Sequence, residues 1–281
     1  MLLVKEWMNG VDVRLDTLIA SLRHWWPDLE LQQVTRLSQN PQFLLIRMPG
    51  GWVVKWARTR PARRRLAFES RQLARWQGIA GVPQVESLAE DLMRYRWVEG
   101  QPLSSKAHPE SWAPVIGEFL AAIHDPRYLP PELRADRRRR IQARYTRRLY
   151  RRAVEIVFDW LLPREMRMLD TISAPYLDGT DERPMAVLHG HFEPRTVLVE
   201  NGQLSGVIGW GHLRVGDPLW DFVYWPPEWT ERWIAPDTAE NARLRWYRIL
   251  LALYAILTAF DKGHLESIEK GVEHLQRLLN R

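Results

Sequence analysis

The chain has 281 residues, which is long enough to bury a large core without the help of disulfides or a structural metal. It contains no cysteine, and this excludes a disulfide scaffold, a thiolate zinc site and a cysteine nucleophile. The formal net charge is +6, and arginine supplies all but five of the 40 basic residues. The longest apolar stretch, 249–260, is shorter than the ~20 residues of a membrane span, so we expect a cytoplasmic protein with no membrane partner.

Residues 1–94 are expected to form a small N-terminal lobe that is rich in strands. Apolar spacing predicts helices over 15–25 and 61–77. Alternating or β-rich runs predict strands over 31–37, 43–48, 52–56, 85–88 and 93–98. Gly50 and Gly51 separate the second strand from the third, and they predict a hairpin turn.

The rest of the chain is expected to contain a short hinge, 95–100, and a larger, mostly helical C-terminal lobe, 101–281. Helices are predicted over 111–124, 136–162, 239–260 and 264–279. A β-rich island lies among them, with strands predicted over 185–188, 196–199 and 204–208. Asn201 and Gly202 favour a hairpin turn between the last two strands, because both residues tolerate positive φ. The predicted fold class is α+β.

Four segments carry a family resemblance. Residues 189–199 and 206–211 resemble the catalytic and metal-binding loops of the aminoglycoside phosphotransferase family. The resemblance continues through 216–222, and it extends back to 116–124. This family has a protein-kinase-like fold, so the resemblance implies two lobes, a β-rich N-terminal one and a helical C-terminal one.

The resemblance also implies a nucleotide site in the N-terminal lobe. Lys55 stands on the strand that bears the family's nucleotide-phosphate lysine, and Glu69 matches its ion-pair partner. Tyr95 and Trp97, at the start of the hinge, are the other candidate nucleotide contacts. The alternative for Lys55 is a purely structural pair, because a buried ammonium group needs a carboxylate partner in either case.

The catalytic positions depart from the family pattern. The family's acceptor-orienting Asp and its two Mg²⁺ ligands, Asn and Asp, stand here as His191, Thr196 and Gly209. Glycine offers no side chain and threonine only a neutral hydroxyl, whereas Mg²⁺ prefers several oxygen ligands. We therefore do not expect a Mg²⁺ site, and ATP binding stays open. The loop over 37–43, which would cover the phosphates, also lacks glycine.

These departures predict a pseudokinase, which keeps the fold as a ligand-binding or protein-docking module without transferring phosphate. One alternative is an active ATP-dependent small-molecule kinase that uses His191 or Glu193 as its base. Another alternative is a transition-metal site formed by His189, His191, Glu193 and His212.

Three residues around the altered loops are predicted to have structural roles, which the family resemblance implies. His189 is expected to form a hydrogen bond to nearby backbone. Asp217 is expected to accept backbone N–H groups and fix the catalytic loop, and Asp221 to begin the following helix, where a carboxylate suits the helix dipole.

Residues 134–152 contain ten arginines and one acid. Ile141, Tyr145 and Leu149 recur at a spacing of four residues and predict one buried stripe, with arginines on the other faces. The candidate binding patch consists of Arg137, Arg138, Arg139, Arg140, Arg144, Arg147 and Arg148.

A further alternative for the function is an Arg-rich module in which this patch binds an acidic partner; the expected partner of the protein is an unknown small molecule or an acidic protein. A cationic acceptor such as an aminoglycoside would be repelled by the patch. A nucleic acid is not expected, because no nucleic-acid-binding motif accompanies the charge. The alternative is a solvated helix whose arginines pair with acidic loops.

Overall fold

A computed structural model describes residues 15–27, 34–103, 107–131, 135–177, 183–235 and 238–280. The chain divides into two compact units, one of residues 1–104 with 195–213 and one of residues 105–194 with 214–281. The predicted C-terminal lobe therefore contains a stretch, 195–213, that groups with the first unit. The predicted hinge stays a prediction. Among the described helices, none has the length and apolar character that a bilayer crossing needs.

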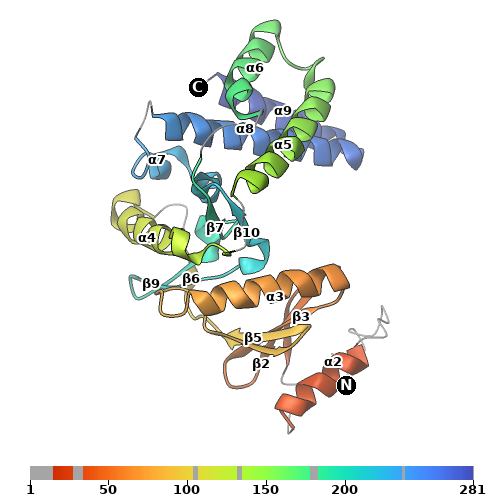
Figure 1. Ribbon diagram of the computed structural model, residues 1–281, viewed down its shortest axis with the longest axis vertical. Coiled ribbons are helices and arrows are strands. Elements are labelled where there is room, and N and C mark those ends of the chain that lie inside the picture. Colours follow the sequence, from red (N-terminus) through yellow and green to blue (C-terminus); the bar gives the residue numbers. More distant parts are fainter. Residues whose placement is uncertain are drawn as a thin grey trace. The chain divides into compact units, whose positions relative to one another are not determined.

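The first unit is built on an antiparallel sheet of five strands in the order β1-β2-β3-β5-β4. Figure 1 labels its strands β2, β3 and β5. Its strands are β1 (Thr35–Gln39), β2 (Phe43–Met48), β3 (Trp52–Ala57), β4 (Val85–Ala89) and β5 (Leu92–Arg96). Gly50 and Gly51 have φ of 72° and 74° in the β2–β3 turn, which confirms the predicted hairpin. The strand predicted over 31–37 begins at Thr35, and residues 31–33 lie outside the described residues.

Helix α2 (Leu15–Trp25) packs on one face of this sheet. Leu18 and Leu22 of α2 join a buried cluster with strand residues that include Leu44, Ile46 and Val54. Helix α3 (Arg60–Arg75) begins after Thr59, whose hydroxyl accepts a hydrogen bond from the N–H of Ala62.

A second, three-stranded sheet belongs to the first unit. It contains β6 (Gln101–Pro102), β8 (Val197–Glu200) and β9 (Gln203–Val207) in the order β6-β8-β9. Asn201 and Gly202 form the turn between β8 and β9 with φ of 50° and 75°, as the sequence predicts. The short turn η4 (Trp210–His212) follows β9.

The second unit is mostly helical (Figure 1). Its helices are α4 (Pro109–Ile123), α5 (Ala135–Val157), α6 (Pro163–Leu177), α7 (Pro227–Thr230), α8 (Ala239–Asp261) and α9 (Leu265–Leu279), with the 3-10 turns η2 (Pro126–Tyr128) and η5 (Pro218–Phe222). The antiparallel pair β7 (Ala186–Leu188) and β10 (Arg214–Gly216) completes the unit. Helix α8 supplies much of the core, with Leu244, Leu253 and Ile256 fully buried.

Two expectations for the arginine-rich helix were wrong. The helix predicted over 136–162 ends at Val157, and α6, which the sequence did not predict, begins at Pro163. A proline disfavours helical geometry at the preceding residue and suits a helix start, so the chain turns between the two helices.

The predicted buried stripe of α5 was also wrong. Ile141 and Tyr145 are 47% and 54% exposed, and only Leu149, at 9%, is buried. The buried side of α5 instead carries Ala153 and Tyr150, whose hydroxyl donates to Asp170 over 2.7 Å. Leu149, Tyr150, Ala153 and Val157 of α5 belong to the buried cluster that contains the core residues of α8, whereas Ile141 and Tyr145 do not.

Candidate nucleotide and catalytic-loop sites

A buried ion pair links β3 and α3 in the first unit. The Nζ atom of Lys55 lies 2.9 Å from Oε1 and 2.6 Å from Oε2 of Glu69. Both side chains are buried, and Glu69 lies on the inner face of α3 with Leu66 and Leu73. The predicted pair is therefore formed, and each charge has the partner that a low-dielectric surrounding requires.

The ammonium group of Lys55 is closely surrounded by other residues of the first unit. Its Nζ atom lies 4.6 Å from the centre of the Phe43 ring. A Cβ atom on Gly211 would lie 3.2 Å from Nζ, so glycine allows the backbone after β9 to approach the lysine. Burial raises the pKa of the Tyr95 hydroxyl, and the charge of Glu69 raises it further. Tyr95 therefore remains protonated near neutral pH.

Trp97 lies beside a different cation. The backbone N–H of Trp97 donates to the carbonyl of Gly51 over 2.8 Å. The guanidinium group of Arg47 lies 4.3 Å from the centre of the Trp97 ring, and it also pairs with Glu99 at 3.7 Å. The structure therefore brings Tyr95 near the Lys55–Glu69 pair, whereas Trp97 contacts Arg47. Nucleotide binding by these residues stays a prediction.

The positions of the two family metal ligands, Thr196 and Gly209, lie in the first unit. The carbonyl of Thr196 accepts a hydrogen bond from the N–H of Ile208 over 2.9 Å. Gly209 has φ 87° and ψ 24°, a left-handed conformation that glycine adopts without strain. A donor set of no side chain and one neutral hydroxyl does not fit Mg²⁺, which prefers charged oxygen ligands.

His191, at the position of the family's acceptor-orienting Asp, lies in the second unit and contacts two neighbours. Its Nε2 atom lies 3.0 Å from Oε1 of Glu193. Its ring stacks on Tyr224 with a centroid distance of 4.5 Å and an angle of 10° between the planes. The N–H of His191 also points at Nδ1 of His189, 3.4 Å away, which places His189 in a structural contact with the loop backbone.

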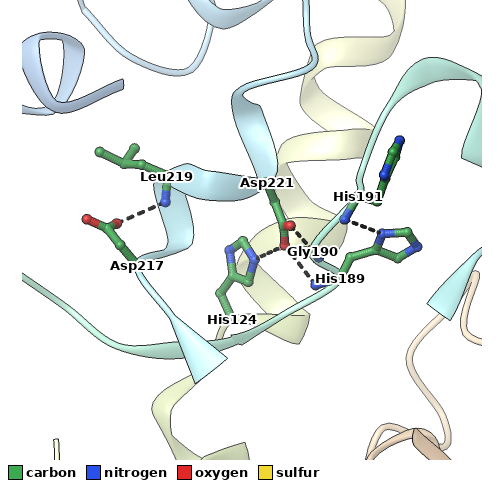
Figure 2. Close-up of polar contacts among 7 residues, drawn as sticks. All are labelled: His124, His189, Gly190, His191, Asp217, Leu219 and Asp221. Carbon is green, nitrogen blue, oxygen red and sulfur yellow. Dashed lines mark hydrogen bonds and ion pairs between the residues drawn. The ribbon is translucent and has the colours of Figure 1, made fainter. Parts of the chain in front are cut away.

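The carboxylate of Asp221 anchors this loop from η5 (Figure 2). One oxygen accepts the N–H of Gly190 over 2.7 Å. The other oxygen accepts the N–H of His189 and lies near Nε2 of His124, both at 2.9 Å. Asp221 is 0% exposed. Asp221 therefore connects the loop to the end of α4, where His124 follows Ile123.

The carboxylate of Asp217 contacts η5 and α8. One of its oxygens accepts the N–H of Leu219 over 3.0 Å and so caps η5. The other accepts the hydroxyl of Tyr247 over 2.9 Å and pairs with Nε of Arg243 at 2.7 Å. Asp217 accepts a backbone N–H and Asp221 lies in the first turn of η5, as predicted, but the prediction that Asp217 fixes the catalytic loop was wrong. Asp221 accepts the loop N–H groups, while Asp217 connects η5 to Tyr247 and Arg243 of α8.

The environment of Asp221 predicts a loss of stability in acid. Burial by itself would raise the pKa of this carboxyl, but the hydrogen bond and charge of His124, the charge of His189 and the N–H of Gly190 hold it below its usual value. The stabilisation is present above the unfolded-state pKa of about 3.9, and it is lost as the pH falls through the lower folded-state pKa. Urea unfolding between pH 2 and 6 measures this loss, and D221N is expected to flatten the profile below about pH 4. An unchanged profile in D221N would contradict the assignment.

The predicted arginine patch on α5 separates into groups with different contacts. Arg139 donates from Nε to the carbonyl of Arg183 over 3.2 Å. Arg147 donates from Nε and Nη2 to the carbonyl of Leu177 over 3.0 and 2.7 Å. Leu177 is the last residue of α6, so Arg147 satisfies a carbonyl that has no partner within its own helix.

The remaining patch residues are Arg137, Arg140, Arg144 and Arg148, which are exposed, and Arg138, which is partly buried. Within the described ranges, Arg137, Arg144 and Arg148 take part in no hydrogen bond or ion pair. An acidic protein partner for this exposed side of α5 stays a prediction. The described residues also include no group of three or more His, Asp or Glu side chains placed to hold a metal ion.

A five-stranded sheet with a buried lysine–glutamate pair and a helical unit with a carboxylate-anchored loop together define a kinase-like fold. The model of the phosphotransferase enzyme family matches residues 30–259, and the chain belongs to this family. No curated protein matches the chain.

Solved structures support the same fold. The GDP and kanamycin complex of APH(2")-IIia is 17% identical, covers 93% of this chain and 98% of its own, and has a TM-score of 0.70. Macrolide 2'-phosphotransferase MphH from Brachybacterium faecium is 21% identical, with coverage of 94% and 98% and a TM-score of 0.62. Aminoglycoside phosphotransferase APH(4)-Ia has a TM-score of 0.64 at 14% identity, with coverage of 93% and 98%.

Proposed function

We propose that this protein is a pseudokinase of the phosphotransferase family, a binding module that does not transfer phosphate. The observation that carries the proposal is the donor set at the catalytic positions, above all Gly209, where the family places its metal-binding Asp. Without a charged oxygen ligand, the site lacks the electrostatic stabilisation of transferring phosphate that a bound metal supplies. The absence of cysteine fits a reducing compartment, and we place the protein in the cytoplasm on that ground.

The other contacts of the site support a protein that has kept the family's fold but not its catalytic activity. Lys55 and Glu69 remain paired, and Asp221 still anchors the altered loop. These contacts stabilise the fold whether or not a nucleotide binds. Lys55 and the end of β5, where the predicted hinge begins, provide the groups through which ATP would bind without Mg²⁺.

A phosphotransfer assay with radiolabelled ATP and Mg²⁺ tests the proposal, and wild type is expected to show no turnover. We expect T196N/G209D, which restores two oxygen donors, to gain Mg²⁺-dependent thermal stabilisation by ATP. The variant T196A/G209A is the control, because it also places a side chain at the positive φ of residue 209 but supplies no oxygen donor. Mg²⁺-dependent turnover by wild type would overturn the proposal.

One observation favours a second candidate, an active small-molecule kinase. The Nε2 atom of His191 lies 3.0 Å from Oε1 of Glu193, and a carboxylate beside an imidazole orients the ring for proton transfer. For such an enzyme, H191A is expected to lower turnover by about 10²–10⁴-fold. Turnover in wild type that falls in H191A would favour this candidate over the pseudokinase.

A further inference from the structure

We propose that α5 and β10 form a binding site for the oxyanion of a small ligand, with Arg138 and Arg214 as the groups that contact it. The inference deepens the proposed function, because it names the chemical class of ligand that the binding module takes. Both arginines belong to the second unit, so the site is described entirely within that unit.

A hydrogen bond places the two arginines beside each other. Gln142 of α5 donates from Nε2 to the carbonyl of Val215 in β10 over 2.9 Å. Arg138 lies one helical turn before Gln142 and on the same side of α5, while Arg214 directly precedes Val215. Burial lowers the pKa of Arg214, and the positive charge of Arg138 is among the groups that act on it, which agrees with their closeness.

Each of these side chains has a buried donor with no acceptor. Nε of Arg138 and Nη2 of Arg214 are buried and have no hydrogen-bond partner in the described part of the chain. Neither guanidinium group forms an ion pair with a described residue. Buried donors in proteins are nearly always satisfied, and two like charges side by side are unfavourable without an anion between them.

Among the described residues, the carboxylate that acts on the pKa of Arg214 already has partners. Asp221 acts on the pKa of Arg214 but uses both oxygens for the loop N–H groups and His124. A guanidinium group matches carboxylate and phosphate oxygens with paired hydrogen bonds. An oxyanion is therefore the ligand chemistry that would satisfy both buried donors and separate the two positive charges.

Aromatic side chains lie near Arg214. The guanidinium group of Arg214 lies 4.2 Å from the centre of the Trp220 ring. Tyr145, one turn beyond Gln142 on α5, is 54% exposed, and with Tyr224 it acts on the pKa of Arg214. Tyr224 in turn stacks on His191 of the altered catalytic loop. These rings suit a ligand that carries an apolar or aromatic body next to its anionic group.

Thermal unfolding at constant ionic strength tests the site with inorganic phosphate, phenyl phosphate and benzoate as probes. We expect a bound probe to raise the Tm by about 3 °C at ten times its Kd. R138Q and R214Q are expected to lose this shift. R144Q is the matched control, because Arg144 is exposed on the same helix and has no partner among the described residues.

The variants have a second readout without any probe. R138Q removes one of two adjacent like charges, so its Tm is expected to equal or exceed that of wild type. R214K keeps the positive charge and the aliphatic part of the side chain next to Trp220. It replaces R214Q as the test variant if R214Q does not fold. A shift with both phenyl compounds identifies a general oxyanion site, and a shift with phenyl phosphate but not benzoate identifies a phosphate site.

Two results would overturn the inference: no probe shifts the Tm of wild type, or R138Q responds as wild type does. Either would leave the pseudokinase proposal intact, because that proposal depends on phosphotransfer. Conversely, measured turnover would end the pseudokinase proposal and leave the oxyanion site in place.

Discussion

Replacing Asp221 with asparagine is expected to lower the free energy of unfolding by about 3 kcal/mol or more. The carboxylate accepts the N–H groups of His189 and Gly190 and pairs with His124 while it is completely buried. An asparagine has a single oxygen, and its NH₂ group would face one of these donors. Urea unfolding followed by circular dichroism measures the difference.

Asp125 provides the matched control for this variant. Its carboxylate also accepts a backbone N–H, that of Arg127 over 2.8 Å, but it is partly exposed at the start of η2. D125N is expected to cost about 1 kcal/mol or less. If D221N proved no more costly than D125N, the three contacts of Asp221 would not be what holds the loop in place.

A double-mutant cycle on Lys55 and Glu69 is expected to show the second large effect. K55M leaves the buried Glu69 carboxylate without a partner, and it should cost about 3–5 kcal/mol. K55M/E69L removes both charges, and much of the lost stability is expected to return, because two apolar residues suit the buried position. Denaturant unfolding of the four proteins yields the coupling energy.

The same four proteins separate a structural role of Lys55 from nucleotide binding. A stable K55M/E69L that lost all thermal stabilisation by ATP would indicate that Lys55 contacts the nucleotide phosphates. A stable K55M/E69L that responded to ATP as wild type does would indicate a purely structural pair. A cost below about 1 kcal/mol for K55M would contradict the buried pair itself.

Local sequence signals predicted much of the first unit. The β2–β3 and β8–β9 hairpins follow from Gly50, Gly51 and the Asn201-Gly202 pair, since positive φ selects few residue types. Helix α6 was missed because its composition is mixed, with an internal Pro175. Strand β10 was missed because its three residues, Arg214–Gly216, contain one apolar side chain, that of Val215, and so form neither an alternating nor a β-rich run.

The candidate site was predictable only in part. The family resemblance located Lys55, Glu69 and the altered catalytic positions, because these lie in contiguous motifs. It gave the loop contact to Asp217 instead of Asp221, because the two aspartates are four residues apart, at the start of η5 and inside it, and only the folded chain decides which one reaches Gly190. The closeness of Arg138 and Arg214 likewise depends on the packing of α5 against β10, which no local pattern encodes.

The anchoring of the loop by Asp221 has a consequence for how such a protein evolves. The groups that set the path of residues 189 and 190 are different from those that would carry out a reaction. Substitutions at the catalytic positions 191, 196 and 209 can therefore accumulate with little loss of folding stability. A substitution of Asp221, in contrast, would both release the loop and destabilise the fold. A protein with this arrangement can lose catalysis through single substitutions while the rest of it stays folded and able to bind other molecules.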